Sequence, residues 1–136
     1  MSDNNIQGCP APQNITLVQR LQPLLGRTVT VFTPGFPQLT KTTGKLSNVT
    51  ATTFTVGTNQ IFFQTSFFIV LRHPVKHVKP FDLTATAEEI GSLTGKLIRV
   101  GKDFVEFVQV PGKKDVPTLF PLNFFTEVRC EREHDE

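Results

Sequence analysis

The sequence contains no tryptophan and no tyrosine, although it has 13 phenylalanines. Phenylalanine has no polar atom, so we expect most of these rings to fill a core rather than to form the amphipathic contacts typical of recognition surfaces. No apolar run approaches the roughly 20 residues that a membrane span requires. The polar segment 1–13 also lacks the basic start and apolar centre of a secretory signal. We therefore expect a protein made in the cytoplasm without a signal peptide, and no membrane partner.

Acidic residues are missing from a long stretch of the chain. Between Asn4 and Phe81 there is no Asp or Glu but there are seven Lys and Arg, whereas residues 82–136 hold eleven acidic and seven basic residues. The net charge of the whole chain is only +2. This asymmetry favours either binding of a polyanion by the basic half or head-to-tail self-association, in which basic and acidic parts of two molecules meet.

Cysteine is scarce, and its two positions lie near opposite ends of the chain. Cys9 and Cys130 have no partner at CxxC or zinc-ligand spacing, so no metal site is indicated. In a reducing cytosol we expect an inert pair of thiols. The alternative that stays open is an intermolecular disulfide through Cys9, which lies in the flexible context Gly8-Cys9-Pro10.

No group of side chains indicates catalysis, a metal ion or a cofactor. His73 and His77 are separated by Pro74, which prevents the helix that would place them on one face. No serine or cysteine lies in a nucleophile motif, and the glycines do not form a phosphate-binding loop. We interpret Asp103 and Glu106 as the polar face of a strand rather than as an acid–base pair. We predict a non-enzymatic protein without a small-molecule substrate.

Short alternating segments dominate the first half. A short helix is predicted from Ile15 to Leu25, where apolar residues follow helical spacing and Pro23 ends or kinks the helix. Alternation of β-branched and aromatic residues then predicts five strands, at 27–32, 44–49, 53–56, 60–63 and 68–71. Short strands with glycine at the bends favour a strongly bent antiparallel sheet or small barrel, because bending hides edges that would aggregate.

The second half partly repeats the first. Gly44-Lys45-Leu46, Val49 and Phe54 recur as Gly95-Lys96-Leu97, Val100 and Phe104, and Phe63, Phe67, Phe68, Leu71 and Arg72 recur as Phe120, Phe124, Phe125, Val128 and Arg129. No counterpart of the strand 27–32 is recognised, because Thr86 and Glu89 resemble a capping box that opens a second short helix.

The pattern predicts a mostly β protein of two small antiparallel barrel modules, each preceded by a short helix. The predicted divisions are a flexible segment 1–13, module 1 at 14–73, a linker at 74–82, an incomplete module 2 at 83–130 and a charged tail at 131–136. The open edge of an incomplete module could be covered by another part of the chain or by another subunit through strand addition.

The succession of helix, Leu25-Gly26, alternating strand, Gly44-Lys45-Leu46 and Phe67-Phe68-Ile69-Val70 resembles a bacterial Sm-like or SH3-like small barrel. The tandem pattern is similar to the repeated modules of spore coat proteins of endospore-forming bacteria, over residues 15–130. The resemblance implies a structural component of a protein shell, deposited on the spore surface and associating with itself or with other coat proteins. Sm-like barrels also bind single-stranded RNA, so an RNA-binding protein is the alternative.

The residues expected to contact a partner lie in the charged regions and at one loop tip. Phe36 lies between two prolines in a turn, where it could dock on a subunit, stack on a base or fold back into the core. The basic side comprises Lys41, Lys45, Lys76 and Lys79, the acidic side comprises Glu131, Glu133, Asp135 and Glu136, and Cys9 is the candidate covalent lock.

Overall fold

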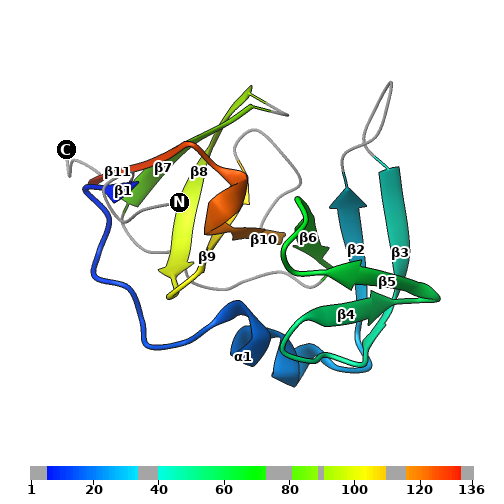
Figure 1. Ribbon diagram of the computed structural model, residues 1–136. Helices are drawn as coiled ribbons and strands as arrows, with labels where there is room; N and C mark the ends of the chain where they lie inside the picture. The colour runs from blue at the N-terminus through cyan, green and yellow to red at the C-terminus, as the bar shows by residue number, and fades with distance from the viewer. Residues whose placement is uncertain (1–5, 34–39, 73–80, 89–90, 110–115, 133–136) are drawn as a thin grey trace.

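The computed structural model describes residues 6–33, 40–72, 81–88, 91–109 and 116–132. Within them lie helix α1 (Leu17–Leu21), the 3-10 helices η2 (Gln22–Leu24) and η3 (Leu122–Phe124), and the strands β1 (Ile6–Gln7), β2 (Thr28–Thr33), β3 (Thr40–Ser47), β4 (Thr53–Val56), β5 (Asn59–Phe62), β6 (Phe68–Leu71), β7 (Phe81–Ala87), β8 (Gly91–Val100), β9 (Phe104–Gln109), β10 (Pro117–Pro121) and β11 (Glu127–Arg132). The predicted mostly β class is confirmed (Figure 1).

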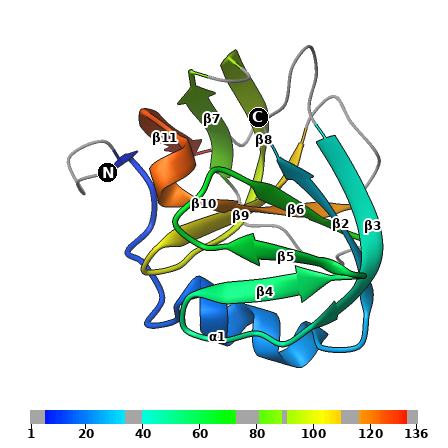
Figure 2. The same cartoon turned by 45° about the vertical axis from the view of Figure 1, so that its right-hand side comes forward.

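The described strands form one hydrogen-bonded series, in the order β1-β11-β7-β8-β9-β10-β6-β2-β3-β4-β5, which has two ends and does not close. Strands β2 to β6 and strands β7 to β11 follow the same internal order, in which the fifth strand lies beside the first and the fourth lies at the far end. The two halves meet where β6 pairs antiparallel with β10 (Figure 2).

The second half therefore contains five strands, and the prediction that it is incomplete and preceded by its own short helix is wrong. Strand β7 occupies Phe81–Ala87, inside which Leu83 faces Gly95 of β8 as Val29 of β2 faces Gly44 of β3. Thr86 lies within β7, and Glu89 lies outside the described residues. Pairing with β8 and β11 on both sides outweighs the local capping signal.

Strand pairing also refines the correspondence between the halves. Leu46 faces Val56 in the first half and Leu97 faces Phe107 in the second, so Phe54 corresponds to Val105 rather than to Phe104. A shift of one residue reverses the face of a strand, and Phe104 accordingly packs in the core of the other half. By the same comparison of facing residues, Ile61 corresponds to Phe120 and Leu71 to Cys130.

The repeated Gly-Lys-Leu motif has a steric cause. A side-chain carbon on Gly44 would lie 2.7 Å from the backbone of Gly57, and one on Gly95 would collide with the carbonyl oxygen of Val108. Each glycine therefore allows the long second strand of its half to approach the backbone of the following hairpin. This close approach is what the sequence repeat preserves.

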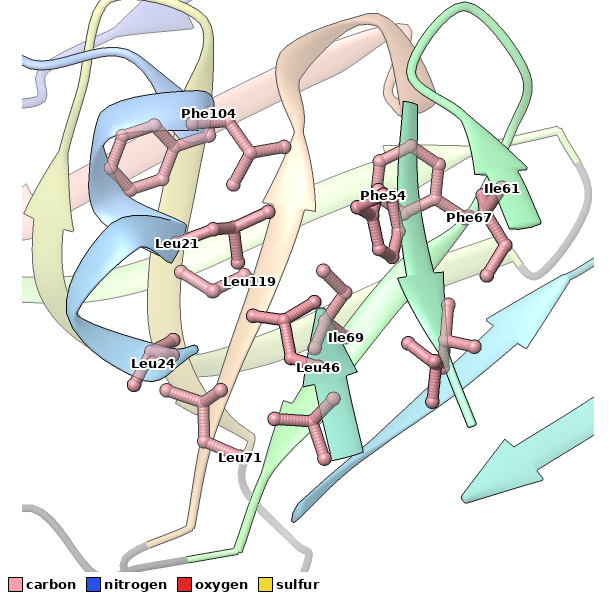
Figure 3. Packing of buried hydrophobic residues seen from close by; sticks show 14 residues of the cluster. Leu21, Leu24, Leu46, Phe54, Ile61, Phe67, Ile69, Leu71, Phe104 and Leu119 are labelled. Atoms are coloured by element: carbon pink, nitrogen blue, oxygen red, sulfur yellow. The ribbon is translucent and has the colours of Figure 1, made fainter. Parts of the chain in front are cut away.

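Two apolar cores exchange residues across the β6–β10 junction. The first core consists of residues from α1, η2 and β2 to β6, of Phe67 just before β6, and of Phe104 and Leu119 from the second half (Figure 3). The second core consists mainly of residues from β7 to β11 and includes Phe68 from β6, whose ring stacks on Phe120 with centroids 4.7 Å apart. Side chains on opposite faces of the paired strands thus bind the halves together.

The N-terminal helical region is shorter and less regular than predicted. The helix α1 ends at Leu21, and the 3-10 helix η2 contains Pro23, as expected for a residue that interrupts helical hydrogen bonding. Thr16 caps α1 in a reciprocal arrangement with Gln19. This arrangement fixes the residue at which α1 starts.

Candidate functional site

Strand β5 forms one end of the series and has only β4 as a strand neighbour among the described residues. Phe63 and Thr52 form a hydrogen-bonded pair across β4 and β5, since the N–H of Phe63 donates to the carbonyl oxygen of Thr52. Phe54 and Ile61, two residues further along the two strands, face each other in the same way. Because bonded and non-bonded pairs alternate in an antiparallel ladder, the backbone polar groups of Gln60 and Phe62 point away from β4. The carbonyl oxygen of Phe62 already accepts from the N–H and the Oγ1 of Thr65, at 3.1 and 2.7 Å. The edge is therefore open for pairing at the N–H and carbonyl of Gln60 and at the N–H of Phe62.

The side chains of this edge are suited to contact with a partner. Phe62 is 46% exposed and Gln60 is also exposed, whereas Ile61 between them is buried in the first core. Strands with exposed apolar side chains and open backbone groups are templates for pairing with another strand. Phe62 was not singled out in the sequence, because a phenylalanine in an alternating segment is more often a core residue.

Strand β11 forms the other side of the molecule, and β1 covers part of its edge (Figure 1). Ile6 faces Val128 and Gln7 faces Arg129, so β1 pairs with two of the six residues of β11. This pairing brings Cys9 to Cys130, whose Cα atoms lie 4.7 Å apart, and the two form a disulfide within the chain. The expectations of an inert thiol pair and of an intermolecular disulfide through Cys9 are therefore wrong.

The described members of the predicted charged surfaces lie near opposite ends of the strand series. Lys41 and Lys45 are exposed on β3, two strands from β5, and Glu131 is exposed on β11. Phe36, Lys76, Lys79, Glu133, Asp135 and Glu136 lie outside the described residues, as do His73 and His77. Strand β11 also carries exposed basic residues, because Arg129 and Arg132 lie on it with Glu131.

Glu106 is buried, which corrects its interpretation as part of a polar strand face. Its side chain accepts from the Nε and Nη2 atoms of Arg20 at 2.9 and 3.1 Å, and the Nε of Arg99 lies 3.1 Å from Oε1. Glu106 itself is 1% exposed. A buried carboxylate requires such partners, and here they join α1 to strands β8 and β9. Arg20 and Glu106 are 86 residues apart, so no local pattern indicated the pair.

Asp103 has a different partner and does not face Glu106 as an acid–base pair. Its Oδ1 atom accepts from the backbone N–H of Leu17 at 2.7 Å, at the start of α1. Nearby, the N–H of Lys102 donates to the carbonyl oxygen of Ile15 at 2.8 Å. Both interactions attach the helix to the turn between β8 and β9. The two carboxylates therefore join the halves of the molecule.

A cleft of about 270 Å³ lies beside this attachment. Its lining is mixed in character and consists of Ile6, Leu17, Val18, Ala51, Phe63, Lys102, Asp103, Pro121, Leu122 and Asn123. Asp103 is already engaged by Leu17. Over the part of the chain that the structure describes, no group of three metal-ligating side chains is present. None of the described helices is long and apolar enough to cross a membrane.

Comparison with known proteins found no matching family model, no matching curated protein and no matching solved structure. The sheet edges and their charges are therefore the observations from which we argue a function.

Proposed function

We propose that the protein is a non-enzymatic structural protein of two Sm-like or SH3-like small-barrel modules that assembles with further copies of itself through its sheet edges. The observation that carries this proposal is the open edge of β5, with the backbone groups of Gln60 and the N–H of Phe62 pointing outward and an exposed ring at Phe62. The sequence resemblance implies a spore coat as the shell, with other coat proteins as further partners.

The junction between the halves supports a second copy as the partner. Strand β10, the fourth strand of the second half, pairs with β6, the fifth strand of the first half. Strand β5 is the fourth strand of its own half and presents the equivalent edge without such a neighbour in the described residues. A second copy would therefore repeat a pairing that the chain already makes internally.

Charge supports a head-to-tail arrangement. The exposed residues near β5 include Lys41 and Lys45, and the sequence has no acidic residue between Asn4 and Phe81. Near the opposite end, Asp82 and Glu131 are exposed on β7 and β11. Arg129 and Arg132 are exposed beside them on β11, so this end carries charges of both signs. Contact between two β5 ends would bring only basic residues together, whereas the β11 end supplies acidic partners, which favours contact between unlike ends.

Light scattering on a sizing column tests this proposal, with refractive-index detection because the chain has no Trp or Tyr. The protein is examined with and without reductant at low and high salt. We expect species larger than one chain in at least one redox state, and loss of these species in the double variant Gln60→Lys, Phe62→Lys. A charge at an edge strand disfavours strand pairing.

Leu25→Lys is the matched control, since Leu25 is 44% exposed but lies in no strand. We expect it to assemble as the unmodified protein does. A single-chain species under every redox and salt condition would overturn the proposal. Equal loss of assembly in the control and in the double variant would also overturn it.

Single-stranded RNA is the second candidate partner, because Phe62 supplies an exposed ring for base stacking and Lys41 and Lys45 supply positive charge. Fluorescence anisotropy of a labelled oligouridine tests it. We expect no saturable binding under the assembly proposal. Binding that weakens with salt and is lost in Phe62→Ala would favour RNA instead.

A further inference from the structure

We infer that β1 is a redox-controlled strap that covers the edge of β11 to which β5 of a second copy would bind. While the Cys9–Cys130 disulfide is intact, the strap stays in place, and reduction releases it. This inference rests on the proposed self-association. It adds the edge to which β5 binds, which is that of β11, and the redox state that controls the binding.

The internal junction indicates which residues would pair between copies. At that junction Thr118 faces Val70 and Leu119 faces Ile69. Because Ile61 is equivalent to Phe120, Asn59 and Gln60 of β5 are equivalent to Thr118 and Leu119 of β10. Because Leu71 is equivalent to Cys130, Val128 and Arg129 of β11 are equivalent to Ile69 and Val70 of β6. A second copy would therefore place Asn59 opposite Arg129 and Gln60 opposite Val128.

The strap occupies these same positions. Ile6 faces Val128 and Gln7 faces Arg129, which are the two β11 residues assigned to β5 of a second copy. One edge of a strand can pair with only one neighbour at a given position. Binding of β1 and binding of a second copy are thus mutually exclusive.

The strap has few noncovalent contacts that would hold it against a competing strand. β1 has two residues and is the parallel member of a series in which the other described neighbours are antiparallel. Ile6 and Cys9 are only partly buried against the second core. Gly8 lies against the carbonyl oxygen of Cys130, where a larger residue would collide. The disulfide is therefore the main restraint on β1.

Release is a two-electron reduction by a dithiol. A thiolate of the reductant attacks the sulfur of Cys9, which is the more exposed of the two residues, and Cys130 leaves as a thiolate that takes up a proton. The second thiol of the reductant then displaces the Cys9 sulfur from the mixed disulfide. The products are two cysteine thiols and the oxidised cyclic disulfide of the reductant.

The test measures self-association of the full chain, oxidised and reduced, by sedimentation or light scattering over a range of concentrations. We expect reduction to lower the apparent dissociation constant by at least about tenfold, because a covered edge reduces the population competent to bind. Cys9→Ser should associate as the reduced protein does in both conditions. Circular dichroism checks that each form remains folded.

A second variant separates coverage of the edge from the covalent bond. Deletion of residues 1–7 removes β1 but keeps the Cys9–Cys130 disulfide. We expect this variant to associate without reductant. Association of the oxidised, full-length protein as strong as that of the deletion variant would overturn the strap.

Charged residues at position 59 test whether β5 of one copy places Asn59 opposite Arg129 of the next. Because like charges opposite each other destabilise strand pairing and unlike charges stabilise it, Asn59→Lys should weaken association of the reduced protein and Asn59→Glu should strengthen it. Combining Asn59→Glu with Arg129→Glu should remove the gain. Equal effects of Lys and Glu at position 59 would overturn the assigned register.

The two proposals fail in different ways. If association needs the β5 edge but is indifferent to reduction and to the loss of residues 1–7, the strap is wrong and the proposed function stands. If hydrogen exchange of the segment 127–132 speeds up on reduction but no condition yields association, the strap is released and the proposed function is wrong. Unchanged exchange on reduction overturns the strap directly.

Discussion

The two halves of the molecule share a strand order but differ at their edges. In the first half β5 is open, whereas in the second half the corresponding strand, β10, is paired with β6. The fifth strand of the first half is buried in the junction, whereas β11 is covered by β1 and a disulfide. One repeated topology therefore supplies a junction, an open edge and a covered edge, depending on what lies beside each strand.

The halves also depend on each other for their interiors. Phe104 and Leu119 fill the first core, and Phe68 fills the second. The first half supplies Arg20, and the second supplies its buried partner Glu106. We therefore expect the halves to unfold together in one transition, which calorimetry and circular dichroism would check by agreement of their midpoints.

The largest effect should come from the disulfide that distinguishes the second half. Reduction removes a cross-link between residues 121 positions apart, and a loop of that order stabilises a fold by about 4–5 kcal/mol through the entropy of the unfolded chain. Urea unfolding followed by circular dichroism measures this loss. Reductant should not change the Cys9→Ser variant further, and a loss below about 1 kcal/mol would contradict the expectation.

The next effect concerns the ion pair that joins the halves. Glu106→Ala leaves Arg20 and Arg99 without their shared carboxylate, so we expect a loss of about 3 kcal/mol. The triple variant Glu106→Leu, Arg20→Met, Arg99→Met should recover most of it, because replacing all three partners by apolar groups removes the unpaired charges. If the triple variant were as unstable as Glu106→Ala, the loss would have to come from packing instead.

A smaller effect compares the two equivalent glycines. Gly95→Ala forces a carbon against the carbonyl oxygen of Val108, and we expect a cost of about 2–3 kcal/mol. Gly44→Ala meets the backbone of Gly57 less closely, with an expected cost of about 1–2 kcal/mol. Urea midpoints measured side by side give the order, and the reverse order would contradict the assigned contacts.

The smallest effect concerns α1, which has no counterpart helix before β7 in the described residues. Thr16→Ala removes the side-chain cap on Gln19 and should cost about 1 kcal/mol. Thr16→Ser keeps a hydroxyl and serves as the control. A thermal unfolding midpoint shared by Thr16→Ala and the control would show that the Asp103 contact to Leu17 alone holds the helix start.

Local patterns in the sequence were sufficient for the class of fold and for much of its first half. The predicted strands at 53–56 and 68–71 coincide with β4 and β6, and the predicted helix covers α1 and η2. Alternation, turn residues and helical spacing act over a few residues, so they are readable without knowing the fold. The Gly-Lys-Leu repeat likewise marked β3 and β8 as equivalent strands.

The contacts between those elements are set by the tertiary structure. The sequence does not indicate that Cys9 meets Cys130 or that Arg20 meets Glu106, since these partners are 121 and 86 residues apart. The sequence does not predict strand β7, because the pairing of this strand with β8 and β11 overrides a local helix signal. The open edge at β5 and the covered edge at β11 follow from the order of all the strands, which arises from long-range pairing and burial rather than from any short segment.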